Sequence, residues 1–200
     1  MKIVLYGMGR PTRATRAAWA LEEAGADWSA EAVDPRSAEY RALNPMGTVP
    51  AIVVDGVLLT ESAAICTWVG EHFPEAGLVP APRTPERAQY DRWSSFVVTE
   101  LEQPCWLKAK HTFVLPEHLR VPQVKNAAQW EFTRAAGVLS EALGDRPFLV
   151  GDQFTCADIL AAHTCFWAQR AGFDLPTGLA TYAGRHAQRP AFQRAMSRPH

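Results

Sequence analysis

The sequence has few cysteines and no paired-cysteine motif. Its 200 residues include four cysteines, at positions 66, 105, 156 and 165. None of them forms a C-x-x-C pattern or has the spacing of a metal site, which argues against a dithiol redox centre and a bound zinc ion. Their neighbours are mostly apolar, so we expect reduced thiols in the core of a cytoplasmic protein, and no metal.

Long apolar runs and a strong charge of one sign are also missing. No segment approaches the roughly 20 apolar residues of a membrane-spanning helix, and the first residues show no secretory signal. The formal net charge is −1, which gives no electrostatic basis for binding nucleic acid or an anionic membrane. We therefore expect a globular protein without either partner, built from one large domain or two modest ones.

Strand patterns are confined to residues 1–76, where they alternate with helical ones in the order βαβ-α-ββα. The strand-helix-strand start implies a parallel strand pair. Asp55-Gly56 separates two short apolar runs, and this dipeptide predicts a type I′ hairpin that adds antiparallel strands. The expected strands are 2–6, 28–33, 51–54 and 57–59, and the expected helices are 14–25, 38–43 and 62–73.

Residues 77–86 lie in a proline-rich stretch without periodicity, and we take them as a linker. Residues 87–200 show helical patterns alone, so a second, all-helical domain is expected there. Pro104 is expected to kink its first long helix or to end the first half of that helix. The expected helices of this domain are 87–111, 122–143, 155–171, 177–186 and 190–198.

The segment 44–65 is the most informative part of the chain. Val49-Pro50 precedes the hairpin, and an X-Pro bond readily adopts the cis form. A cis bond would turn the Val49 N–H and C=O outward, where they could pair with a peptide-like ligand. Glu61-Ser62 follows the hairpin and opens a helix. A hydroxyl beside the unpaired N–H groups of a helix start is suited to binding a carboxylate.

This order of Val-Pro step, hairpin and Glu-Ser pair resembles the glutathione-binding half of the cytosolic glutathione transferases. Residues 148–159 resemble the capping segment of the core helix in the same family, with Thr155 and Asp158 as a capping box. The likeness, to a bacterial-type member, thus extends over most of the chain. It implies an α/β thioredoxin-like domain (1–76) followed by an all-α domain (87–200).

The resemblance also implies a function and partners. Glutathione would be the co-substrate, conjugated to a small apolar electrophile in a detoxification reaction, and the protein would be a homodimer. Val49, preceding Pro50, would pair its backbone with the cysteinyl part of glutathione. Glu61 would accept a hydrogen bond from the γ-glutamyl ammonium, Ser62 would bind the neighbouring carboxylate, and Thr48 would add a further contact.

The loop 8–16 precedes the first helix and contains no cysteine, which disfavours a dithiol oxidoreductase and a glutaredoxin-like enzyme. Glutathione transferases use a hydroxyl or thiol here, or a tyrosine at the end of the first strand, to favour the glutathione thiolate. Thr12 is nearest to the serine position and is our first candidate, with Tyr6 as the runner-up. The Thr12 hydroxyl is equally suited to capping the helix. Arg13 or Arg10 would supply positive charge near the sulfur or the glycine carboxylate.

Other features of the sequence leave alternatives open. Trp106 and Phe113 are candidates for the wall of the second-substrate pocket, although such aromatic residues more often pack in the core. Because no familiar Ser, Tyr or Cys donor stands in the loop, a non-catalytic binding or assembly module is an alternative function. A glutathione-dependent peroxidase is another. An isomerase of the maleylacetoacetate type is less favoured, because its Ser-Ser-Cys loop is absent. The sequence identifies neither the electrophile nor the class within the family.

Overall fold

The computed structural model describes all 200 residues, which form two compact units. The first consists of Met1–Pro80 together with Ala187–His200, and the second is Ala81–His186. The break after residue 80 falls inside the expected linker. The last residues, however, were expected in the second domain and belong to the first unit. None of the helices combines the length and apolar character needed to cross a lipid bilayer.

The first unit is built on a mixed four-stranded sheet in the order β2-β1-β3-β4. Its strands are β1 (Ile3–Gly7), β2 (Trp28–Ala32), β3 (Ala51–Val54) and β4 (Val57–Thr60). β1 and β2 are parallel and the other pairs are antiparallel. Asp55 and Gly56 have φ values of 47° and 89°, as a type I′ hairpin requires. The predicted thioredoxin-like βαβ-α-ββα order is confirmed.

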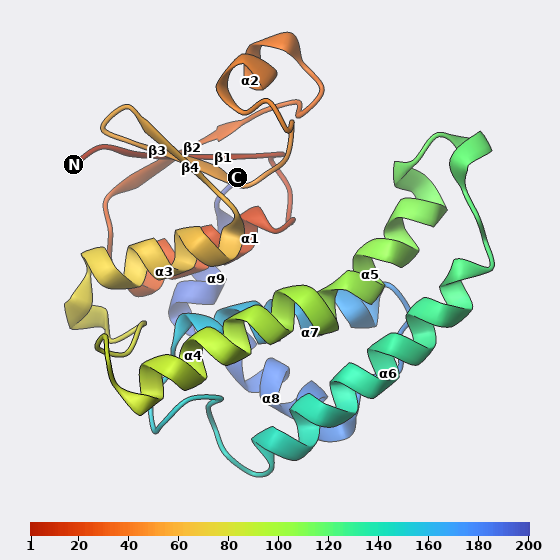
Figure 1. The fold of residues 1–200 in the computed structure, drawn as a ribbon. Coiled ribbons are helices and arrows are strands. Elements are labelled where there is room, and N and C mark those ends of the chain that lie inside the picture. Colours follow the sequence, from red (N-terminus) through yellow and green to blue (C-terminus); the bar gives the residue numbers. More distant parts are fainter. The chain divides into compact units, whose positions relative to one another are not determined.

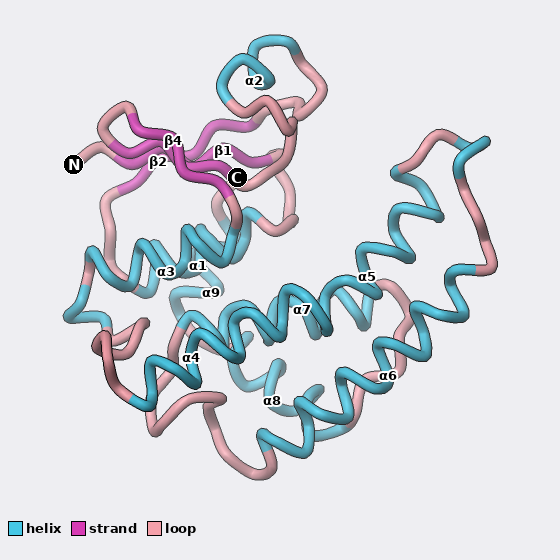
Figure 2. The backbone as a smooth tube through the Cα atoms, in the orientation of Figure 1, coloured by secondary structure: helices cyan, strands magenta, loops and turns pink.

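Helices lie on both faces of this sheet (Figures 1 and 2). α1 and α3 are on one face and α2 is on the other. The core between α1, α3 and the sheet contains Leu5, Leu21, Ile52 and Ile65, all 0 % exposed. The helices of this unit are α1 (Ala14–Glu23), α2 (Ala38–Leu43), α3 (Ser62–His72), the short 3₁₀ turn η1 (Pro74–Ala76) and α9 (Pro190–Ser197).

α9 belongs to the first unit because it packs on α1. The Phe192 ring meets the edge of Trp19, with 4.7 Å between the ring centroids. Three arginines of this C-terminal segment also pair with the two glutamates at the end of α1: Arg189 with Glu23, and Arg194 and Arg198 with Glu22. Packing and charge together explain why Ala187–His200 cluster with the first unit.

The second unit is helical throughout, as predicted. Its helices are α4 (Pro85–Phe96), η2 (Val97–Leu101), α5 (Glu102–Ala109), η3 (Lys110–Val114), η4 (Glu117–Leu119), α6 (Val124–Leu143), α7 (Cys156–Arg170) and α8 (Thr177–Ala187). Residues 85–114 form one bent helical path, beside which α6 runs (Figure 2). α7 packs against α4, η2 and α5, and most of its residues are buried.

Pro104 does not end the long helical path, which is bent and continues beyond this residue (Figure 2). It lies inside α5, directly after the π-helical turn η2, in which the Glu102 N–H donates to the Val97 carbonyl. A proline in a helix has no N–H and its ring collides with the carbonyl four residues earlier. The wider π turn gives that carbonyl room. The disturbance expected at Pro104 is therefore absorbed one turn before it.

The predicted capping box at α7 is confirmed. The Asp158 carboxylate accepts hydrogen bonds from the Thr155 N–H (2.8 Å) and hydroxyl (3.0 Å), the Leu149 N–H (2.8 Å) and the Tyr182 hydroxyl (2.7 Å). Burial raises the pKa of Asp158, and the hydrogen bonds from Tyr182, Leu149 and Thr155 act in the opposite direction. One buried side chain thus joins the preceding loop, the start of α7 and α8.

The four cysteines are all buried and none forms a disulfide. Burial, and then the neighbouring Cys105, raise the pKa of Cys165 to about 12. Because the thiolate is the reactive form, we expect no cysteine of the folded protein to react with a disulfide reagent at about pH 8, and all four to react after denaturation. Free glutathione under the same conditions is the positive control. Rapid labelling of the native protein would show that at least one thiol is accessible.

Candidate functional site

Three segments of the first unit meet at one end of the sheet. Tyr6, near the end of β1, pairs with Ala51 at the start of β3, and Ala51 pairs with Thr60 at the end of β4. β1 and β4 therefore end, and β3 begins, at the same end of the sheet. This register brings together the loop before α1, the Val49-Pro50 step and the Glu61-Ser62 pair.

The Val49-Pro50 peptide bond is cis. Just before it, the Thr48 carbonyl accepts hydrogen bonds from the Tyr40 hydroxyl (2.7 Å) and from Asn44 Nδ2 (2.8 Å). Both donors belong to α2 and its C-terminal end, so α2 fixes the backbone that leads into Val49. The Val49 N–H and C=O have no backbone partner. They remain the polar groups of this segment that a ligand can use.

Glu61 has an unusual backbone conformation, with φ 66° and ψ 113°. Such a conformation costs a non-glycine residue about 1–3 kcal/mol and is found mostly at functional sites. The Glu61 side chain is exposed beside the start of α3. Ser62 is the first residue of α3 and is buried, at 6 % exposed.

Arg16 contacts this pair and is a residue that sequence reasoning missed. Its guanidinium is 0 % exposed, and Nη1 donates to Ser62 Oγ at 3.2 Å. Arg10 and Arg13 were the arginines expected from the sequence to supply positive charge. The available signal was helical spacing, because Arg16 follows Thr12 by one helical turn.

Thr12 lies at the start of α1 as expected. Its hydroxyl oxygen accepts a hydrogen bond from the Ala14 N–H at 3.1 Å, and its carbonyl accepts one from the Thr15 N–H. The capping role suggested by the sequence is therefore present. It is compatible with a role as donor to a sulfur, because a hydroxyl accepts and donates at the same time.

Tyr6 lies on the face of the sheet opposite α1. Its ring is 6.2 Å from the ring of Tyr40 in α2, measured between centroids. Burial, and then the charge of Glu31, raise the pKa of Tyr6. The phenol is therefore protonated at neutral pH and can act only as a hydrogen-bond donor to an anion.

His200 is a second residue that sequence reasoning missed, and no pattern in the sequence indicates its position. It is 2 % exposed, and its Nε2 lies 3.0 Å from Thr15 Oγ1. Its Nδ1 lies 2.7 Å from the Arg198 carbonyl, and burial lowers the pKa of the ring. The neutral ring thus donates from Nδ1 and accepts the Thr15 hydroxyl at Nε2. A Cβ on Gly7 would lie 2.2 Å from the His200 carbonyl carbon, so this approach requires glycine at the end of β1.

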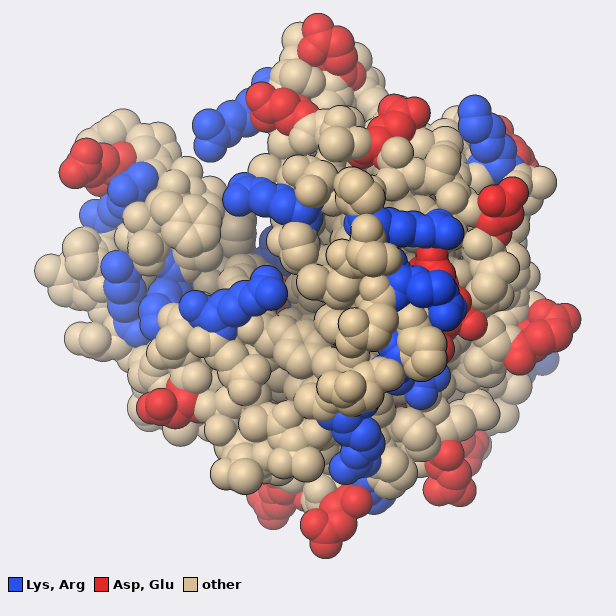
Figure 3. Space-filling model, turned by 180° about the vertical axis from the view of Figure 1, so that it is seen from behind, with Lys and Arg blue, Asp and Glu red and all other residues tan.

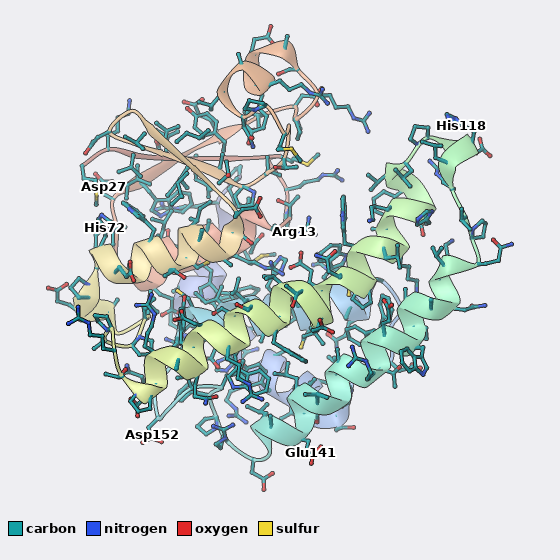
Figure 4. All side chains as sticks on the ribbon, in the orientation of Figure 1. Arg13, Asp27, His72, His118, Glu141 and Asp152 are labelled. Atoms are coloured by element: carbon teal, nitrogen blue, oxygen red, sulfur yellow. The ribbon has the colours of Figure 1, made fainter.

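The remaining predicted site residues are Arg13 in the first unit and Trp106 and Phe113 in the second. Figure 4 shows Arg13 at the N-terminal end of α1. In the second unit, Trp106 is half-buried and its ring lies 6.5 Å from that of Trp167, while Phe113 is 68 % exposed. Their assignment to a second-substrate pocket stays a prediction.

Charged side chains of both signs lie on the surface. The face drawn in Figure 3 carries Lys and Arg side chains as well as Asp and Glu side chains, and the formal net charge is −1. No group of three or more His, Cys, Asp or Glu side chains is placed to hold a metal ion. The polar groups at the end of the sheet, which are the Val49 backbone, the Glu61 carboxylate and the Ser62 hydroxyl, are suited to an organic ligand with both an ammonium and a carboxylate.

Two family models match the chain. The model of the glutathione S-transferase N-terminal domain matches residues 12–72, and that of the C-terminal domain matches residues 103–198. Glutathione S-transferase GST-4.5 of Xanthomonas campestris is 32 % identical over 145 residues, which cover 72 % of this chain and 71 % of the relative. GstA of Escherichia coli O157:H7 is 28 % identical over 186 residues, covering 88 % and 89 %.

Solved structures agree with these matches. A ternary complex of BphK, a bacterial glutathione S-transferase, has a TM-score of 0.85 and 30 % identity and covers 98 % of both chains. A sphingomonad glutathione S-transferase complexed with glutathione has a TM-score of 0.84 and 29 % identity, covering 98 % of this chain and 97 % of that one. Both domains of the family are thus present in the same order and over nearly the whole length. The chain belongs to the glutathione S-transferase family.

Proposed function

We propose that this protein is a glutathione transferase, with glutathione as its co-substrate, that presents the glutathione thiolate to a small apolar electrophile. The observation that carries this proposal is the meeting of three segments at one end of the sheet. There, the Val49 N–H and C=O, which have no backbone partner, lie at the same end of the sheet as the exposed carboxylate of Glu61 and the hydroxyl of Ser62. Family membership and the glutathione-bound sphingomonad relative support it.

The γ-glutamyl and cysteinyl parts of glutathione each have a matching group. The Val49 backbone pairs with the cysteinyl residue, in an orientation set by Pro50 and by the fixed Thr48 carbonyl. Glu61 accepts from the γ-glutamyl ammonium. Ser62, with the N–H groups at the start of α3, binds the α-carboxylate, and the positive end of the helix dipole favours this anion.

Activation of the thiol is assigned to the start of α1. A thiol with a pKa of about 8.5 is only slightly ionised at neutral pH, so the protein must stabilise the anion. Thr12 donates its hydroxyl hydrogen to the sulfur, and the α1 dipole and Arg13 add positive potential. Tyr6 is the second candidate for the donor.

Titration of the bound thiol by its ultraviolet thiolate absorbance tests this function. We expect bound glutathione to have a lower pKa than free glutathione. Thr12→Val, which removes the hydroxyl at similar volume, should raise the bound pKa by about 1 unit and slow conjugation about tenfold. Thr12→Ser is the control that keeps the hydroxyl.

Two results would change the assignment. A bound thiol with the pKa of free glutathione, and no turnover over a panel of electrophiles, would favour the non-catalytic binding module. If Thr12→Val leaves the pKa of the bound thiol and the conjugation rate unchanged, while Tyr6→Phe raises that pKa, the donor role would belong to Tyr6.

We further propose that the protein acts as a homodimer in the cytoplasm. Dimers are typical of the family. The absence of disulfides among four buried cysteines supports a reducing compartment.

A further inference from the structure

Arg16 is attached to α3 from two sides. Its guanidinium donates to Ser62 Oγ at 3.2 Å, and its backbone carbonyl lies 3.6 Å from the Cys66 thiol, which donates to it. Ser62 and Cys66 are separated by one helical turn on α3. The first turn of α1 is thereby held against the first turn of α3, at the end of the sheet where the Val49 and Glu61 segments also lie.

The chemistry of arginine determines the orientation of the Ser62 hydroxyl. A guanidinium has donors only, so Ser62 Oγ must be the acceptor in this contact. The hydrogen of the Ser62 hydroxyl is then directed to a different atom. A hydroxyl that accepts from a cation is also polarised into a stronger donor. The arrangement suits an anionic acceptor on the ligand.

The burial of Arg16 and the two helix dipoles also favour an anionic group on the ligand. Arg16 is 0 % exposed, and burying a permanently charged guanidinium is costly unless other groups compensate for the lost hydration. The positive dipole ends of α1 and α3 lie on the same side and also favour an anion. A carboxylate bound at Ser62 would be stabilised by all three groups at once.

We propose that Arg16 is a positioning residue for the α-carboxylate of the γ-glutamyl group. It fixes the acceptor side of the Ser62 hydroxyl, so that the hydroxyl hydrogen is aimed at that carboxylate. This inference rests on the proposed function and deepens it. Arg16 acts through Ser62 and has no role at the sulfur.

Calorimetric binding of two ligands separates this role from a general effect on the fold. One is S-methylglutathione. The other is its analogue with a 4-aminobutanoyl group in place of γ-glutamyl, which lacks only the α-carboxylate. Arg16→Gln should weaken binding of S-methylglutathione about tenfold or more, as expected for loss of a charge-assisted hydrogen-bond network, and leave binding of the analogue unchanged. Arg16→Lys should restore part of the loss.

Steady-state kinetics with glutathione provide a second readout. In Arg16→Gln, the KM for glutathione should rise while kcat changes little, because the α-carboxylate is bound equally in the ground state and the transition state. Arg36→Gln is the matched control, since Arg36 is an exposed arginine of the same unit. It should alter neither ligand's affinity.

Equal losses for both ligands, or no loss for either, would overturn the role of Arg16. Failure of the unaltered protein to bind S-methylglutathione would instead overturn the proposed function itself, and the role of Arg16 with it. If the Arg16 variants do not fold, nitrogen-15 spectra of the unaltered protein decide. The slowly exchanging guanidinium signal of Arg16 should shift with S-methylglutathione and not with the analogue, and an unshifted signal would refute the proposal.

Discussion

Replacement of Asp158 by alanine is expected to lower the free energy of unfolding by about 4 kcal/mol, among the largest effects of single substitutions. The carboxylate is completely buried and accepts four hydrogen bonds, from Thr155, Leu149 and Tyr182. Alanine would leave all four donors buried without an acceptor. An orphaned buried donor costs about 1–3 kcal/mol, and these costs are only partly additive because the groups share one site.

Graded variants identify the cause of this loss. Tyr182→Phe removes one donor and leaves the carboxylate in place, so it should cost only about 1 kcal/mol. Asp158→Asn keeps one acceptor oxygen and should fall between the two. Denaturant unfolding followed by circular dichroism measures all three. A cost below that of Tyr182→Phe for Asp158→Ala would mean that water replaces the carboxylate and that the network contributes little.

Phe192→Ala is expected to lower the free energy of unfolding by about 3 kcal/mol. Phe192 is 9 % exposed and packs on Trp19, which is 0 % exposed. Removing the ring leaves a cavity beside a rigid tryptophan, and this position cannot collapse freely because α1 is fixed against the sheet. α9 should then detach at lower denaturant concentration than the rest of the first unit.

A matched variant compares packing with charge at the same helix. Arg194 pairs with Glu22, but the Arg194 side chain is 53 % exposed. Ion pairs screened by solvent contribute little, so Arg194→Gln should cost about 1 kcal/mol or less. A larger cost for Arg194→Gln than for Phe192→Ala would show that the ion pairs hold α9 in place.

The parts of the fold that depend on neighbouring residues could be predicted from the sequence. The Asp55-Gly56 turn needs two positive φ angles, and few other dipeptides supply them. The capping box at Thr155 is likewise contained within a few residues. The position of α9 could not be predicted, because an amphipathic pattern shows that one face is buried and does not show against which helix.

The same distinction holds for the candidate site. Val49-Pro50 and Glu61-Ser62 could be found because each is a short motif next to a strand end. Arg16 meets its partner 46 residues away, and His200 meets Thr15 across 185 residues. Arginine is rarely buried, so a sequence reading places such a residue in solvent by default. Only the folded arrangement of the sheet and helices shows that Arg16 contacts Ser62 at the candidate site.

The discontinuity of the first unit has a consequence for the order of folding during synthesis. Domains generally fold as units, the N-terminal one first, as the chain emerges from the ribosome. Here the first unit is completed by Ala187–His200, which follow the whole second unit in the sequence, so Trp19 lacks the packing of Phe192 until these residues have been synthesised. The second unit is continuous in the sequence, so all its residues are synthesised before Ala187. The unit whose first residues are synthesised earliest is therefore the one whose residues are complete last.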